Sequence, residues 1–184
     1  SGDWVTPFEQ DPLLANTIYT GYDKVYKSSN GGSTWVSISQ GFGENLNHLK
    51  IAPSSNLVMY ASHGNTLYKT INGGTTNWTQ LSGFSGSINS IAIHPTNPNK
   101  VAIATTSDQK VYVSNNGGIT WISYLYDLPD FSAQALVWEN NGRDGLYLGM
   151  NYGVYYIDNE FNTSWQSFSN NLPNVIISEL EINY

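Results

Sequence analysis

The 184-residue chain has no cysteine, one arginine and no long apolar run. The lack of cysteine excludes disulfide bonds, zinc-thiolate sites and thiol nucleophiles, and is compatible with an oxidising exterior without requiring one. No apolar run approaches the roughly 20 residues of a membrane-spanning helix. No histidine pair at metal-ligand spacing and no calcium-loop motif is present, so we expect no metal and no cofactor.

Charged residues are also scarce, at 11% of the chain against about 25% in an ordinary soluble domain. The formal net charge is -7, and the seven lysines and arginines form no basic patch. Nucleic acids and anionic membranes demand clustered cations, so we expect neither nucleic acid binding nor membrane insertion. Ser, Thr, Asn, Gly and Tyr replace the charged residues, which suits secretion and contact with sugars.

What the chain does contain is an internal repeat. The stretch "YKSSNGGSTW", which begins at Tyr26, returns three times, the last time in altered form. It closes on a tryptophan in each copy, at intervals of 43, 43 and 44 residues: Trp35, Trp78, Trp121 and Trp165. One structural unit is therefore being copied.

Each repeat holds four short apolar runs, which in the second copy are "HLKIAP", "VMYASH", "TLYKT" and "NWTQLS". Runs rich in Val, Ile, Tyr, Trp and Thr, separated by Gly, Asn and Pro, are typical of strands. No stretch shows a convincing helical period. Four strands in about 43 residues predict the blade of a β-propeller. The expected fold class is therefore all-β, a propeller with four-stranded antiparallel blades, with four blades and the first strand of a fifth.

The predicted blades cover residues 1-46, 47-88, 89-132 and 133-173, in one domain without an internal linker. Residues 174-184 align with the first strand of a repeat and begin the next blade. We therefore expect a segment of a larger propeller. Its last strand would pack against the remainder of a longer parent chain or against a neighbouring copy.

The quoted stretch lies between the third and fourth runs, where a hairpin turn is required. The side-chain oxygen of Asn30 can accept hydrogen bonds from nearby backbone N–H groups, and Gly31 or Gly32 can adopt a φ that other residues resist. The ring of Trp35 can cover the turn and fill the space beside the next blade. We interpret the stretch as a structural turn and not as a binding site.

The pattern Ser/Thr-x-Asn/Asp-x-Gly-x-Thr-Trp resembles the Asp-box, or BNR repeat, of sialidases, sortilin-type receptors, xyloglucanase-like glycoside hydrolases and many secreted bacterial propellers. In that family the boxes lie on the periphery, away from the functional face. The fourth copy has Glu160 and Phe161 in place of the glycines. The matching residues are Ser28, Asn30, Gly32, Thr34, Trp35, Thr70, Asn72, Gly74, Thr76, Trp78, Ser114, Asn116, Gly118, Thr120, Trp121, Asn159 and Trp165.

A narrower likeness concerns the segments "SINSIAIHPTNPNKVAIATT" and "NNLPNVIISELEINY". They are similar to segments of long, multidomain surface or secreted proteins of Bacteroidetes-type bacteria. This resemblance implies an extracellular location, either secreted or at the cell surface, and a bacterial source. It implies no assigned chemistry.

The first strand of each blade is expected to line the central channel. Alternation places Phe8, Ile51, Ile93 and Trp138 in a column that packs between blades, and turns the intervening side chains toward the channel. The ionisable channel-lining residues are then Glu9, His48, Lys50, His94, Glu139 and Glu181. Glu9 and Glu139 could form the carboxylate pair of a glycosidase, but their ring also contains alanine and asparagine and shows no convergence on a reacting atom.

Two enzyme classes can be compared with the sequence. Resemblance to sialidases would bring three arginines for the substrate carboxylate, and Arg143 is the only arginine, so a sialidase confined to these residues is excluded. A xyloglucanase-like glycoside hydrolase relies on two aspartates. That alternative stays open if this chain is a fragment whose catalytic acids lie partly outside it.

We therefore favour a non-catalytic recognition or spacer module, with a role in adhesion or carbohydrate binding. Its ligand would be a glycan or a surface protein, held by aromatic side chains on the loops between blades. The candidate residues, each of which could instead pack its own loop, are Tyr22, Phe42, Phe84, Tyr126, Phe131 and Tyr152. A pure scaffold with no ligand is the third interpretation.

Overall fold

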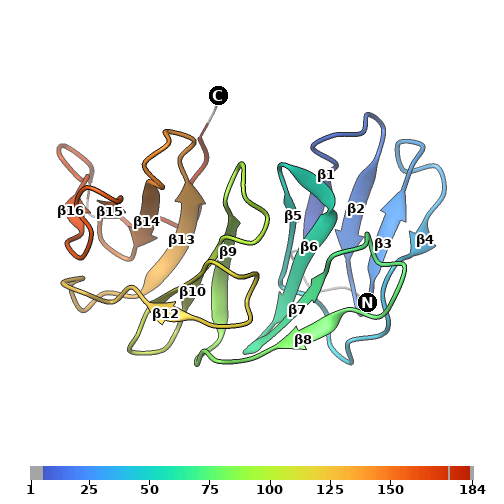
Figure 1. The fold of residues 1–184 in the computed structure, drawn as a ribbon, viewed down its shortest axis with the longest axis horizontal. Coiled ribbons are helices and arrows are strands. Elements are labelled where there is room, and N and C mark those ends of the chain that lie inside the picture. The colour runs from blue at the N-terminus through green and yellow to red at the C-terminus, as the bar shows by residue number, and fades with distance from the viewer. Residues whose placement is uncertain (1–5, 174, 183–184) are drawn as a thin grey trace. The chain divides into compact units, whose positions relative to one another are not determined.

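The computed structural model describes residues 6-173 and 175-182, and these residues form sixteen strands and no helix (Figure 1). The strands make four sheets, each with four antiparallel strands in chain order. This confirms the predicted all-β fold and its four-stranded antiparallel blades. The chain divides into two compact units, residues 1-82 and 83-184, and each unit contains two of the sheets.

Unit 1 contains the first two blades. Blade 1 consists of β1 (Phe8–Gln10), β2 (Ile18–Gly21), β3 (Val25–Ser28) and β4 (Val36–Ser37). Blade 2 consists of β5 (His48–Ala52), β6 (Ser55–His63), β7 (Thr66–Thr70) and β8 (Thr79–Leu81).

Unit 2 contains the other two blades. Blade 3 consists of β9 (Ile88–Ile93), β10 (Val101–Thr105), β11 (Val111–Ser114) and β12 (Ile122–Ser123). Blade 4 consists of β13 (Ala133–Trp138), β14 (Leu146–Met150), β15 (Val154–Ile157) and β16 (Gln166–Ser167). β9 begins at Ile88, one residue before the expected start of the third blade at residue 89.

The core of each unit lies between its two blades. In unit 1, Leu49 and Met59 of blade 2 belong to one buried cluster with Tyr19 and Val25 of blade 1. In unit 2, blade 4 contributes large side chains such as Trp138, and β10 of blade 3 contributes only small ones, Ala102 and Ala104. Large side chains against small ones allow two sheets to fill the space between them without voids.

The three regular copies of the turn share one hydrogen-bond pattern. In the first, Gly32 N donates to Ser28 Oγ at 2.8 Å and Thr34 N donates to Asn30 Oδ1 at 2.9 Å. Ser28 Oγ in turn donates to Asn30 Oδ1 at 2.9 Å, and Gly32 has a φ of 93°. The same bond, from the Ser or Thr hydroxyl that begins the turn to the asparagine, recurs in the second and third copies. These side chains therefore bond to their own turn.

Each turn is also tied to the chain around the start of the second strand of its own blade. Gly31 N donates to the carbonyl oxygen of Asn16 at 2.8 Å, and Gly73 N donates to that of Leu57 at 2.9 Å. The third and fourth copies make the corresponding bonds, from Gly117 N to Asn99 O and from Asn159 N to Arg143 O.

The fourth turn is organised by Asp158, whereas the sequence pattern assigned this role to Asn159. The buried carboxylate of Asp158 accepts hydrogen bonds from Glu160 N at 2.9 Å and Phe161 N at 3.0 Å. The amide of Asn159 is directed elsewhere, and donates to Asp144 Oδ2 at 3.0 Å. A charged acceptor one position earlier thus replaces the asparagine of the other copies.

Two of the turn tryptophans, Trp78 and Trp165, pack on the blade that precedes them in the chain. Trp78 Nε1 donates to Ile38 O of blade 1 at 2.9 Å, and Trp165 Nε1 donates to Tyr124 O of blade 3 at 2.8 Å. Trp121 is half-buried, and its Nε1 has no acceptor among the described residues. The ring of Trp35, which was predicted to fill the space beside the next blade, is instead 40% exposed.

Residues 175-182 contain no strand, although residues 174-184 were expected to begin a fifth blade; residues 174, 183 and 184 lie outside the described residues. The segment instead lies along blade 4. Ile177 N donates to Met150 O at 3.1 Å, and the Ile177 side chain occupies the space in front of Gly149.

Candidate functional site

A hollow of about 420 Å³ lies in unit 2, where β10 turns into β11 and where the chain passes from blade 3 to blade 4. We call it the blade 3–4 groove. Polar side chains line most of it. The lining residues are Asn89, Thr105, Thr106, Ser107, Asp108, Lys110, Asp130, Phe131, Ser132, Ala133 and Gln134.

The loop that forms one wall of the groove is fixed by its own hydrogen bonds. Thr106 N donates to Ser87 O at 2.9 Å, and Ser87 N donates to Thr106 Oγ1 at 2.9 Å. Lys110 N donates to Ser107 O at 3.0 Å, and Lys110 has a positive φ of 58°. A wall held in this way is preformed, so a ligand would not have to order it.

Two amide side chains lie in the groove with one end already bonded. Asn89 Nδ2 donates to Ala133 O at 2.8 Å, and Gln134 Nε2 donates to Asn151 Oδ1 at 2.8 Å. These bonds fix the orientation of both amides. Neither amide oxygen has a hydrogen-bond donor among the residues that the structure describes, so both remain acceptors for a hydroxyl group.

An exposed aromatic pair stands at the rim of the groove. The rings of Phe131 and Tyr152 are 5.1 Å apart between centroids, in an edge-on arrangement. Phe131 is 36% exposed and Tyr152 49%. The two loops are joined by a hydrogen bond from Asn151 N to Ser132 O at 3.1 Å. The pair therefore presents apolar surface to solvent beside polar groups whose positions are fixed.

The groove also contains three charged residues that the sequence analysis did not select. Lys110 Nζ lies 3.0 Å from Asp130 Oδ1, and the carboxylate of Asp130 is fully exposed. Asp108 is exposed on the same loop as Lys110. No motif marks these residues. The available signal was position: Asp108 and Lys110 lie between the second and third strands of blade 3, and Asp130 lies in the connection to blade 4.

Of the six aromatic residues predicted to bind a ligand, only Phe131 and Tyr152 contact each other among the described residues. Phe42 was a wrong prediction, because it is only 8% exposed and packs on Tyr68 at 4.3 Å between centroids. Phe84 is half-buried and packs edge-on against Tyr112 and Trp121. Both phenylalanines serve loop packing.

The remaining two aromatics are exposed but lie outside the blade 3–4 groove. Tyr22 is on the loop between β2 and β3 in unit 1. Tyr126 stacks on Tyr124 at 5.2 Å between centroids and has a positive φ of 38°. It lines a second, smaller hollow in unit 2.

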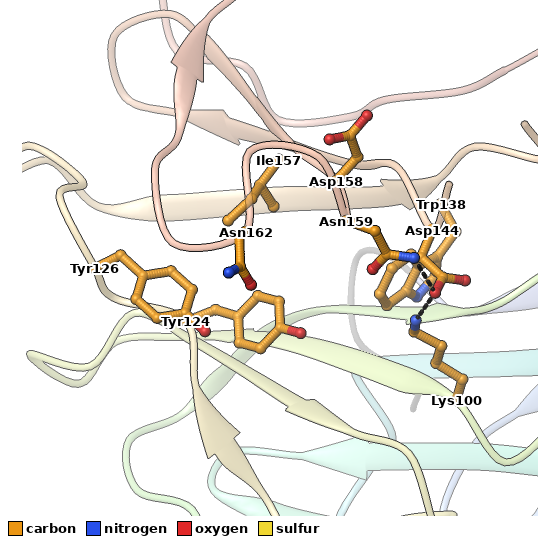
Figure 2. A pocket seen from close by; sticks show the side chains of 9 residues that line it. All are labelled: Lys100, Tyr124, Tyr126, Trp138, Asp144, Ile157, Asp158, Asn159 and Asn162. Carbon is orange, nitrogen blue, oxygen red and sulfur yellow. Dashed lines mark hydrogen bonds and ion pairs between the residues drawn. The ribbon is translucent and has the colours of Figure 1, made fainter. Parts of the chain in front are cut away.

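Figure 2 shows this second hollow, where Lys100 and Asn159 both point to Asp144. Lys100 Nζ lies 2.7 Å and His94 Nε2 3.2 Å from the carboxylate of Asp144. Burial acts to raise the pKa of Asp144, but the hydrogen bonds from Lys100 and Asn159 lower it overall. The hollow has a volume of about 70 Å³. At about 30 Å³ for each water, that is room for water molecules and not for a sugar ring.

Several predicted channel residues have partners within their own unit. Lys50 Nζ lies 2.5 Å from Glu9 Oε1 in unit 1. In unit 2, Glu139 accepts a hydrogen bond from Asn141 at 2.7 Å. The hypothetical carboxylate pair Glu9 and Glu139 is thus divided between two units. Each carboxylate has its own partner.

The other residues predicted to line the channel have different surroundings. His94 is buried against Trp138, with ring centroids 5.4 Å apart, and burial lowers its pKa although Asp144 opposes this shift. His48 is half-buried at the start of β5, and Glu181 is exposed outside any strand. Both faces of a blade can pack against neighbouring blades. Alternation along a strand therefore does not identify a channel face.

Comparison with solved structures shows what the fold is similar to. No family model matches the chain, and no curated protein is significantly similar to it in sequence. A GH74 enzyme from Niastella koreensis has a TM-score of 0.65 at 17% identity, over 89% of this chain and 24% of that one. The GH74 xyloglucanase from Xanthomonas campestris gives 0.69 at 15% identity, over 89% and 30%. YCF48 from Cyanidioschyzon merolae gives 0.64 at 15% identity, over 90% and 56%.

The similar structures are β-propeller proteins, so the four sheets are propeller blades. At these identities the likeness extends to the fold alone. The chain spans less than two thirds of the length of each of these proteins. Among the described residues, no helix is long and apolar enough to cross a membrane.

Proposed function

We propose that this chain is a non-catalytic recognition module that binds neutral glycans in the blade 3–4 groove. The observation that carries the proposal is the exposed pair Phe131 and Tyr152 at the rim of a preformed polar groove. Ligand sites of about 300 to 1,000 Å³ accommodate small molecules, and the volume of about 420 Å³ falls in that range.

The chemistry of the groove matches that of a sugar ring. A pyranose has an apolar face of C–H groups, which can pack on an aromatic ring, and a rim of hydroxyls, which donate and accept hydrogen bonds. Phe131 and Tyr152 supply the first kind of contact. The side-chain oxygens of Asn89 and Gln134 supply the second.

The charges favour a neutral ligand. The groove has two carboxylates, Asp108 and Asp130, against one ammonium group, and Lys110 is already paired with Asp130. An acidic polysaccharide would meet net repulsion there, at distances where screening by salt is incomplete.

We further propose that the repeats are Asp-boxes and that the module belongs to a secreted or cell-surface bacterial protein. Support comes from the repeated turn with its self-contained hydrogen bonds and from the low content of charged residues. A surface protein is the alternative ligand, and it would use the same two exposed rings as its anchor.

The test is titration calorimetry against a panel of neutral and acidic polysaccharides. Tyr152→Ala and Phe131→Ala should each weaken binding to a neutral glycan about fivefold or more, because a stacked ring is worth on the order of 1 kcal/mol. Tyr22→Ala is the matched control, because Tyr22 is an exposed tyrosine on the corresponding loop of blade 1. Unchanged binding in both groove variants would contradict the proposal.

A second candidate is a fragment of a xyloglucanase-like glycoside hydrolase. The specific observation in its favour is that Asp108 and Asp130 line one groove, since such enzymes use two carboxylates. The salt bridge of Asp130 with Lys110 and the full exposure of its carboxylate weigh against it. A general acid normally needs burial to raise its pKa.

A further inference from the structure

The chain contains four Asn-Gly pairs, three in the regular turns and one in the loop between β13 and β14. The pairs are Asn30-Gly31, Asn72-Gly73, Asn116-Gly117 and Asn141-Gly142. In an Asn-Gly pair the backbone nitrogen of the glycine can reach the side-chain amide of the asparagine, because glycine has no Cβ to block the approach. Attack by that nitrogen is the first step of spontaneous deamidation.

In two respects the four pairs are alike. The glycines share one backbone conformation, with φ angles of 67°, 66°, 72° and 72° in chain order. The side-chain oxygen of each asparagine accepts a hydrogen bond from a later backbone N–H, at 2.9, 3.1, 3.0 and 2.9 Å in the same order. Such a bond stabilises the negative charge that the oxygen gains when its carbon is attacked. All four amides are therefore similarly prepared as electrophiles.

The pairs differ in the nitrogen that would attack. In the three turns it is held by a carbonyl oxygen: Gly31 N donates to Asn16 O at 2.8 Å, and the bonds of Gly73 N and Gly117 N are 2.9 and 2.7 Å long. Gly142 is exposed, and its N–H has no acceptor among residues 6-173 and 175-182. A bonded N–H must first be released by local opening of the turn, and a free N–H need not.

We infer that Asn141 is a site of spontaneous deamidation in the folded chain. Gly142 N gives its proton to water or hydroxide and forms a bond to Cγ of Asn141. The bond from Cγ to Nδ2 breaks, and the amide nitrogen takes up a proton from water and leaves as ammonia. Water then opens the resulting succinimide ring at either of the two bonds between the ring nitrogen and a carbonyl carbon. The products are aspartate and isoaspartate at position 141, and water is the only co-reactant.

The product carries a negative charge beside an existing one. Asn141 Nδ2 donates to Glu139 Oε2 at 2.7 Å and to Tyr156 Oη at 3.1 Å, and a carboxylate cannot make these bonds. Two carboxylates at such a distance repel each other, so the loop should move away from Glu139. The same loop carries Asp144, which holds Lys100 of blade 3 (Figure 2). Deamidation would therefore weaken a contact between blades 3 and 4.

The test is peptide mapping by mass spectrometry during incubation of the whole 184-residue chain at mildly alkaline pH, where the attacking nitrogen loses its proton more easily. Asn141 should convert at least about tenfold faster than each turn asparagine, a ratio that corresponds to about 1.4 kcal/mol of local opening. The chain unfolded in guanidinium chloride is the control, and there the four pairs should convert at similar rates. Asn141→Gln should remove the fast conversion, because glutamine would have to form a larger ring.

A second measurement tests the effect on the loop. Asn141→Asp and Asn141→Ala both lack the amide, but only the first places a carboxylate beside Glu139. At neutral pH the aspartate variant should melt at a lower temperature than the alanine variant, and the difference should disappear below a pH of about 4, where carboxyl groups are protonated. Three results would overturn the inference: no conversion of Asn141 in the folded chain, a turn asparagine that converts as fast as Asn141 there, or an aspartate variant as stable as the alanine variant at neutral pH.

Discussion

The indole nitrogen of Trp78 lies 2.9 Å from the carbonyl oxygen of Ile38, forty residues earlier in the chain. A repeat is thus joined to the one before it by a hydrogen bond from the side chain that closes its turn. The ring itself is buried in a cluster with Phe42 and Leu46. The bond and the packing fix the position of blade 2 on blade 1.

Trp78→Ala should lower the free energy of unfolding by about 3 to 5 kcal/mol, because it empties a packed site and leaves the carbonyl of Ile38 without its donor. Trp35→Ala is the matched control and should cost under about 1 kcal/mol in the monomer, because Trp35 is largely exposed. Urea unfolding of both variants measures the difference. Equal losses would show that the tryptophans act on their own turns and not on neighbouring blades.

The fourth turn allows a direct comparison of adjacent residues. Asp158→Ala should destabilise the chain by about 1 to 3 kcal/mol, because two backbone N–H groups lose their acceptor. Asn159→Ala removes only a hydrogen bond to Asp144 that is exposed to solvent, and should cost less than half as much. Thermal unfolding monitored by tryptophan fluorescence would rank the two variants. A larger effect at Asn159 would restore it as the central residue of the turn.

Asp11 makes stability depend on pH in unit 1. Burial acts to raise its pKa, but hydrogen bonds from Leu13 N, Tyr19 Oη and Asn56 lower it below 3.8 overall. A carboxyl whose pKa is lower in the folded state contributes stability above its unfolded value, and loses it as the pH falls through the folded value. Stability should therefore decline below a pH of about 3.8, and Asp11→Asn should reduce that decline. Urea unfolding at neutral and acidic pH tests this, and an unchanged slope in the variant would exclude Asp11 as a cause.

The chain alone should hydrolyse no glycoside. Glu9 and Glu139 each have a partner in their own unit, and Asp130 is paired with Lys110. Incubation with chromogenic glycosides and with xyloglucan, followed by detection of reducing ends, measures any turnover. Turnover that disappears in Asp108→Asn or Asp130→Asn, but persists in Glu44→Gln, would establish the hydrolase alternative.

The blades could be predicted from the sequence because the residues that form each hairpin lie close together within one repeat. Turn glycines, β-branched runs and the asparagine of each turn act within about ten residues of one another, so the pattern specifies the hairpin directly. The turn at Ser28 and Asn30 has the bonds that the residue types implied.

Exposure could not be predicted in the same way, because it depends on which blade covers which face. Phe42 and Phe131 both sit on loops between blades, yet Phe42 is buried under Tyr68 and Trp78 while Phe131 stands at the rim of a groove. The polar groups of the groove come from three separate segments, around residues 89, 108 and 132. No single motif could join them.

The bond from Gly31 N to Asn16 O, with its counterparts in the other three repeats, has a consequence for how such a chain can grow. Each turn finds its backbone partner inside its own repeat, so copying one repeat in the gene copies both ends of that bond. A new blade could then join its neighbours through two contacts: its turn tryptophan would donate to a backbone carbonyl of the preceding blade, and its own carbonyl would accept from the tryptophan of the following one. Tandem duplication could lengthen the array without altering the backbone pairing of any existing blade.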